Sequence, residues 1–125
     1  MFNIICLRFD IMEKRLISSY DEENDTFVGK IGDENGYVAD YGISKGIYLG
    51  INDSNLPAAV LIPNASKVLN TSKSVLESSD VRIGIDCDNS CLTFRMCIEG
   101  LLVFSTKCKN NFGIPDLNYL IDCNL

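Results

Sequence analysis

Hydrophobic and polar residues alternate along most of this chain with the period of a β-strand, in short runs separated by turn-forming residues. The clearest run covers residues 92–98, where every second side chain is apolar: Leu92, Phe94, Met96 and Ile98. Similar runs occupy residues 2–11, 15–20, 46–51, 58–62 and 101–106. The pattern predicts a β-rich fold with seven or eight short strands.

Turn-forming residues predict two hairpins. Asn35-Gly36 separates the apolar residues 26–31 from residues 37–41, and both central positions of a tight hairpin turn favour residues that tolerate positive φ. Residues 87–90 separate a second pair of runs, 81–86 and 91–98. Glu99-Gly100 then turns the chain into residues 101–106. We expect these neighbouring runs to pair as antiparallel strands.

Residues 64–79 have a helical period instead, with Asn64 as the expected N-cap. The positions that recur at helical spacing are Ala65, Val68, Leu69, Ser72, Val75 and Leu76. Pro115 opens a second, short helix over residues 116–123. The expected fold is a single α+β domain over residues 1–125, predominantly antiparallel β with one or two short helices.

Length and composition fit one folded domain, because the 125 residues are 46% hydrophobic. The net charge of −6 argues against binding to nucleic acid or to an anionic membrane, both of which require Lys and Arg. The N-terminus lacks the features of a signal peptide, and no run approaches about 20 apolar residues. We therefore expect a cytoplasmic protein with reduced cysteines: Cys6, Cys87, Cys91, Cys97, Cys108 and Cys123.

The chain contains no histidine, which removes the commonest general base and the commonest metal ligand. Cys87 and Cys91 bracket a turn, but zinc needs four ligands and no second close pair follows. Asp86 and Asp88 have the spacing of a calcium loop without its glycine and final glutamate. We predict that the protein is not an enzyme, with no catalytic residues, metal or cofactor.

Negative charge is concentrated between residues 20 and 40, where seven acidic residues accompany one basic residue, Lys30. Three tyrosines lie within or beside this stretch, and acid together with tyrosine is the composition expected of a surface that docks on a basic protein. A simple solvated loop is the alternative. The expected partner-binding residues are Tyr20, Asp21, Glu22, Glu23, Asp25, Asp33, Glu34, Tyr37, Asp40 and Tyr41.

In this acidic character, carried by Asp21-Glu22-Glu23 and Asp33-Glu34, the chain resembles bacterial immunity proteins of the contact-dependent growth-inhibition type. The resemblance implies a cytoplasmic protein that binds and neutralises one basic toxin domain made by the same cell, with a nuclease as the preferred class. Two other classes stay open. One is a small acidic secretion chaperone or other non-catalytic binding module, and the other is a small enzyme or ligand-binding module that uses carboxylates. The sequence predicts no oligomeric state.

Overall fold

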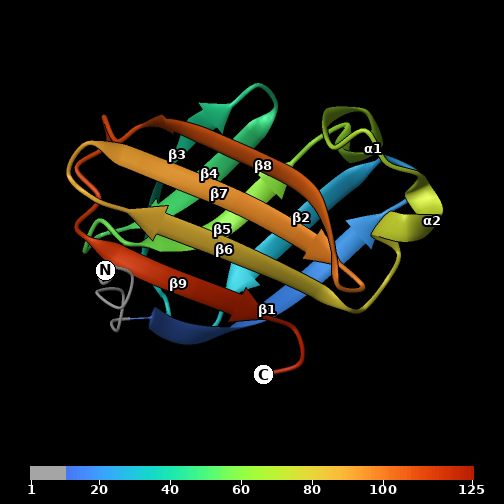
Figure 1. Cartoon of the computed structure of the whole chain (residues 1–125), viewed down its shortest axis with the longest axis horizontal. Helices are drawn as coiled ribbons and strands as arrows, with labels where there is room; N and C mark the ends of the chain where they lie inside the picture. The colour runs from blue at the N-terminus through green and yellow to red at the C-terminus, as the bar shows by residue number, and fades with distance from the viewer. Residues whose placement is uncertain (1–10) are drawn as a thin grey trace, which may run out of the picture.

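The computed structural model describes residues 11–125, in which strands make up most of the regular structure and two short helices complete it (Figure 1). The strands are β1 (Ile11–Asp21), β2 (Thr26–Ile31), β3 (Tyr37–Ser44), β4 (Ile47–Asn52), β5 (Pro57–Ile62), β6 (Val81–Cys87), β7 (Cys91–Ile98), β8 (Leu101–Lys109) and β9 (Leu117–Asp122). The helices are α1 (Ala65–Val68) and α2 (Lys73–Leu76). The expected β-rich fold with one or two short helices is confirmed.

All nine described strands belong to one sheet, in the order β3-β4-β5-β2-β1-β9-β6-β7-β8. β1 and β9 are parallel, whereas the other neighbours are antiparallel. Seven or eight strands, predominantly antiparallel, were expected; the structure instead has nine described strands in a mixed sheet with one parallel pair. The difference arises at β9, whose residues were expected to be helical.

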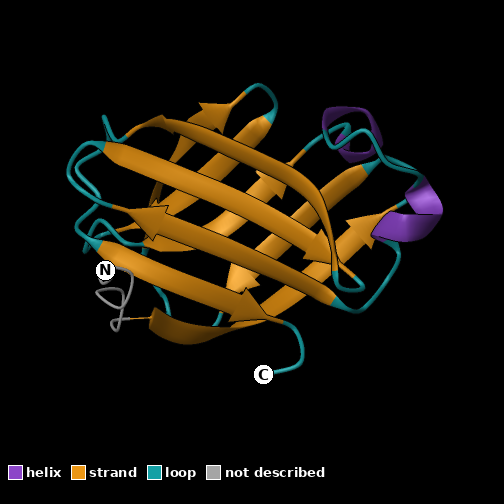
Figure 2. Cartoon of the chain, in the orientation of Figure 1, coloured by secondary structure: helices purple, strands orange, loops and turns teal. Residues whose placement is uncertain are grey.

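The sheet curls into two layers that meet at β1, and the hydrophobic core lies between them (Figure 1). β9, β6, β7 and β8 form one layer, and β2, β5, β4 and β3 form the other. Both helices lie at one end of these layers, which we call the helix end (Figure 2). Within residues 11–125, no helix is long and apolar enough to cross a lipid bilayer.

One of the two predicted hairpins is confirmed and the other is wrong. β6 pairs with β7 as expected, and Glu99 and Gly100, with φ of 52° and 80°, turn the chain from β7 into β8. Gly36 has the expected positive φ of 83°, but the hydrogen-bonded turn lies at residues 31–34, where the Glu34 amide donates to the Ile31 carbonyl at 3.3 Å. β2 pairs with β1 and β5, while β3 pairs with β4. The chain between β2 and β3 therefore crosses the ends of two strands.

Both helix predictions are corrected by the structure. The single helix expected over residues 64–79 is interrupted at Asn70, whose φ of 53° is left-handed, and the chain forms α1 and α2 instead. Asn64 stands at the N-cap position without a capping side-chain bond, whereas the Ser72 hydroxyl accepts from the Val75 amide. The helix expected over residues 116–123 is β9, because its alternating side chains face the core.

The predicted strand over residues 2–11 lies outside the described residues except for its last position, and the one over 15–20 is part of β1. The five described cysteines form no disulfide with one another. Of these five, Cys87 alone lies in the core, where burial and then the charge of Asp86 raise its thiol pKa to about 12. Cys108 and Cys123 pack against the core from its edge.

This burial predicts two classes of thiol reactivity. In denatured, non-reduced protein we expect nearly all six cysteines to react with a thiol reagent. In native protein Cys87 should react far more slowly than the partly exposed Cys91 and Cys97, because it has little thiolate and no access to solvent. Mass spectrometry of time-resolved alkylation measures both. Two or three disulfides in the denatured sample would contradict the expected reducing compartment.

Candidate protein-docking surface

The acidic stretch is divided by strand β2 into two surfaces at opposite ends of the sheet. Asp21 ends β1, and Glu22 and Glu23 lie in the turn that follows it, at the helix end, whereas Asp33 follows the other end of β2. The six residues of β2 span about 20 Å at the usual rise of a strand. The structure therefore does not bring the ten expected partner-binding residues together.

The turn between β1 and β2 is fixed by its own side chains. The Asp21 carboxylate accepts from the backbone and side-chain amides of Asn24, at 3.2 and 2.7 Å. These bonds lower the pKa of Asp21, with the side-chain bond as the larger cause. Glu22 and Glu23 stay exposed. Asp21 thus shapes the turn, while the two glutamates present charge to solvent.

Asp25 joins this turn to helix α1. Its carboxylate accepts from the Tyr20 hydroxyl at 2.6 Å, the Ser66 amide at 3.0 Å and the Ser66 hydroxyl at 2.7 Å, and its carbonyl accepts from the Ala65 amide at 2.8 Å. Desolvation alone would raise the pKa of Asp25, but the hydrogen bonds from Tyr20 and Ser66 outweigh it and lower the pKa. Through these hydrogen bonds, Asp25 and Tyr20 stabilise the contact between the β1–β2 turn and α1.

A cavity of about 470 Å³ opens beside β1 at this end. Leu16, Phe27 and Leu76 form its apolar walls. Its polar lining comes from three places in the sequence, namely Ser18, Ser19, Tyr20, Glu77, Ser78, Ser79 and Cys123. The Ser18 hydroxyl lies 3.3 Å from the Cys123 sulfur across it. The volume lies within the range of ligand-binding pockets in proteins.

Carboxylates from two distant segments act on Tyr20, which lines this cavity together with Glu77. Burial and the hydrogen bond to Asp25 are the largest causes that raise the pKa of Tyr20, and the charges of Glu22 and Glu77 raise it further. Residues 20–25 and 65–79 together carry five carboxylates and two lysines, Lys67 and Lys73. Lys73 donates to the Glu22 carbonyl oxygen at 3.1 Å, which leaves the glutamate side chain to solvent. We call Asp21, Glu22, Glu23 and Glu77 the helix-end surface.

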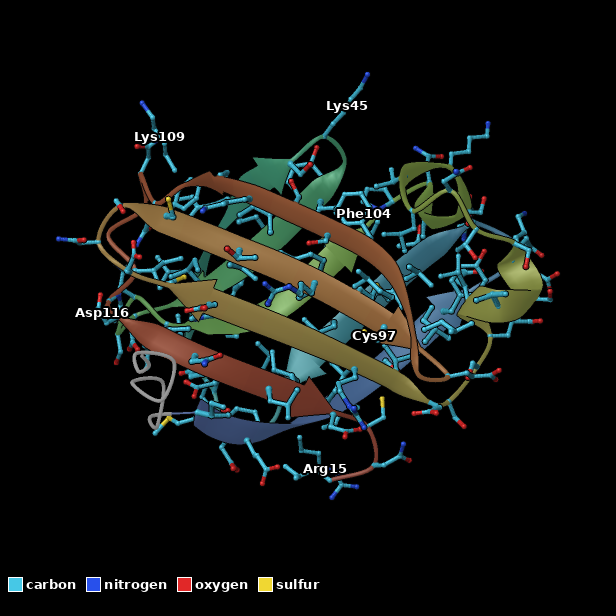
Figure 3. The ribbon with its side chains drawn as sticks, in the orientation of Figure 1. Arg15, Lys45, Cys97, Phe104, Lys109 and Asp116 are labelled. Atoms are coloured by element: carbon cyan, nitrogen blue, oxygen red, sulfur yellow. The ribbon has the colours of Figure 1, made fainter. Side chains whose placement is uncertain are left out.

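The second surface contains an exposed tyrosine. Tyr37 is 62% exposed, and its hydroxyl donates to Asp40 at 2.9 Å, a bond that is the first cause of its raised pKa. It borders a hollow of about 320 Å³ on the outer face of the sheet, together with Val28, Lys30 and Ala59. We call Asp33, Tyr37, Asp40 and Asp53 the loop-end surface; Asp116 lies at the same end of the molecule (Figure 3).

Two of the expected partner-binding residues are used inside the fold. Glu34 is only 8% exposed and accepts from Lys14 at 2.9 Å, from Asn52 at 3.0 Å and from Tyr119 at 3.4 Å. Tyr41 stacks on Phe112 with ring centroids 4.9 Å apart. Glu34 is therefore buried, and Tyr41 is partly buried against the core.

Sequence reasoning missed the second half of the helix-end surface. Glu77 belongs to the polar face of a predicted helix, which is ordinarily a solvated face. The docking of α1 on Asp25 and the bond from Lys73 to the Glu22 carbonyl place that helical segment beside the turn of residues 21–25. Because this is a contact between segments about forty residues apart, no local pattern reports it.

Comparison with known proteins gives no match. No protein family, curated protein sequence or solved structure matches this chain. In the described part of the chain, no three Cys, Asp or Glu side chains gather where they could hold a metal ion. The features that remain for assigning a function are charge, cavities and strand edges.

Proposed function

We propose that this protein is an immunity protein that binds and neutralises a basic protein toxin, and that the helix-end surface is its docking site. The observation that carries the proposal is the cavity of about 470 Å³ lined by Tyr20 and Glu77, next to the exposed carboxylates of Asp21, Glu22 and Glu23. A cavity supplies shape for a partner, and the surrounding carboxylates supply complementarity to Lys and Arg.

A toxin that acts on nucleic acid is the first class to test. Such enzymes need a Lys- and Arg-rich surface to bind phosphates, and an acidic protein that covers this surface blocks substrate access. An inhibitor of this kind needs no catalytic group of its own. Rapid association matters as well, because a toxin made in the same cell has to be captured before it acts.

The experiment is co-expression with the candidate toxin encoded next to this chain in its genome. The proposal predicts that the chain restores growth to cells that produce the toxin domain and that the two proteins co-purify as a stable complex. Growth arrest that persists despite equal expression of both proteins would contradict it. The secretion-chaperone alternative predicts a different outcome, since a chaperone binds its client without suppressing the client's activity.

Replacing Glu22 and Glu23 with alanine should slow association with the toxin. We expect an on-rate reduced by about fivefold at low salt and a flatter salt dependence, because exposed charges steer encounter through a field that ions screen. The thermal unfolding midpoint should be unchanged, since both side chains are exposed. Leaving Asp21 intact preserves the turn that its bonds to Asn24 hold. Stopped-flow kinetics across a salt series measures the effect, and identical on-rates at all salts would show that these glutamates take no part.

A further inference from the structure

Strand β1 changes partners halfway along its length, which leaves part of one edge without a neighbouring strand. Residues 11–15 pair with β9, and the ladder ends at the pair Arg15–Asp122. Residues 16–21 pair with β2 on the opposite side. β9 pairs with residues 11–15 along one edge of β1, and none of the described strands pairs with residues 16–21 along that same edge. The cavity of about 470 Å³ lies along this same stretch.

The direction of the backbone groups follows from one hydrogen bond. The Arg15 carbonyl accepts from the Gly32 amide at 2.7 Å, so the backbone groups of Arg15 point toward β2. Antiparallel pairs alternate between bonded and non-bonded residues, and the register continues without a bulge from Leu16 to Asp21. The amide and carbonyl groups of Ser18 and Tyr20 therefore point away from β2, into the side on which the cavity opens.

We propose that this edge accepts an extended segment of the basic partner, which adds to β1 as a new strand. The proposal rests on the proposed function and names how the helix-end surface would engage its partner. An exposed strand edge is a template for pairing, and proteins use it to bind extended peptides. Main-chain hydrogen bonds would come from Ser18 and Tyr20.

The cavity also indicates the sequence of that segment. Side chains of an added strand alternate between two faces. One face would contact the apolar walls at Leu16, Phe27 and Leu76, whereas the carboxylates of Glu22 and Glu77 stand by Tyr20. An alternation of apolar and basic residues satisfies both environments. A purely acidic segment would meet like charge at the same place.

The test uses two synthetic peptides with the full chain: acetylated, amidated hexapeptides that alternate Lys with Val or Glu with Val. Amide exchange is followed by NMR. In free protein, Ser18 and Tyr20 should exchange much faster than Ile17 and Ser19, which face β2. At about ten times its dissociation constant, the Lys–Val peptide should slow Ser18 and Tyr20 by about tenfold, because exchange then proceeds from the remaining free fraction. The Glu–Val peptide should leave them unchanged.

Two variants and one control variant test the same inference. Ser18→Pro removes an amide that does not serve the β1–β2 ladder, so the protein should fold and bind the Lys–Val peptide about fivefold more weakly, as expected for one lost hydrogen bond. Glu77→Lys leaves the backbone intact and should weaken the same peptide through charge. Asp116→Lys makes the same change in charge at the opposite end and should have no effect (Figure 3).

Several results would overturn the inference. Slow exchange of Ser18 and Tyr20 in free protein would mean that the edge is already occupied. Unchanged exchange with the Lys–Val peptide, or protection confined to another strand, would mean that the edge does not accept a strand. If the chain binds and neutralises the toxin while amide exchange at Ser18 and Tyr20 stays fast, this inference is wrong and the proposed function still stands. A toxin that fails to bind would remove the proposed function itself.

Discussion

Replacing Glu34 with alanine should lower the free energy of unfolding by about 3 kcal/mol, because a buried ion pair and two further hydrogen bonds lose their shared acceptor. The Glu34 carboxylate is 8% exposed and bonds to Lys14, Asn52 and Tyr119. Burial, followed by the charge of Glu34, raises the pKa of Tyr119 to about 12, so this hydroxyl stays protonated as a donor. Chemical denaturation monitored by circular dichroism measures the loss.

The matched control for this variant is Asp33→Asn. Asp33 is the exposed neighbour of Glu34 and has a left-handed φ of 71°, which asparagine tolerates better than alanine. It removes one negative charge from the same turn without removing a buried contact. We expect Asp33→Asn to unfold close to wild type. Equal destabilisation by both variants would show that the turn, and not the buried carboxylate, stabilises this end of the sheet.

Replacing Asp25 with alanine should cost about 2–3 kcal/mol, the second largest effect expected. The change removes the acceptor for Tyr20 and for two donors of Ser66, and it places alanine at a φ of 52°. The helix end should loosen first, because α1 is tied to the β1–β2 turn through this residue. Faster amide exchange in residues 65–79, with β6 and β7 unchanged, would identify that local effect. Uniform loosening of the whole sheet would contradict it.

Asp25→Asn separates charge from shape, since asparagine keeps an acceptor and tolerates positive φ. The pKa of Asp25 is lowered in the folded protein from its ordinary value of 3.8. Its charge therefore contributes stability at neutral pH that is lost as pH falls below 3.8 and through the folded pKa. The difference in stability between wild type and Asp25→Asn should be largest near neutral pH and should shrink in acid. A difference that is independent of pH would assign the effect to shape alone.

Local patterns predicted the strands well and their partners poorly. The alternation over residues 26–31 and 37–41 correctly marks β2 and β3, and Gly36 has the positive φ expected of it. The pairing prediction fails because the chain after β2 crosses the ends of β5 and β4, where Glu34 is buried and accepts from Asn52. A buried carboxylate with partners from three distant elements has no local signature, whereas an Asn-Gly turn has a strong one.

The helices show the same contrast. Asn70, with its left-handed φ, ends one helix, and Ser72 caps the next. The apolar period of the sequence continues through both residues, so it does not indicate where the helix is interrupted. In residues 117–121 every second side chain, Leu117, Tyr119 and Ile121, is buried, which is the period of a strand, whereas the helix was predicted from Pro115 ahead of it. For the candidate site, the sequence predicted the acidic turn at residues 21–23. It could not predict the cavity, because Glu77 and Cys123 reach it from far along the chain.

The most direct test of the helix-end surface compares two double variants that change the total charge equally at opposite ends. Glu22→Lys with Glu77→Lys alters the helix end, and Asp53→Lys with Asp116→Lys alters the other end; each pair shifts the formal net charge from −6 to −2. The on-rate for the basic toxin is measured at low salt. We predict a fall of about tenfold or more for the helix-end pair and little change for the other pair. Equal falls for both pairs, or a larger fall for Asp53 and Asp116, would contradict docking at the helix end.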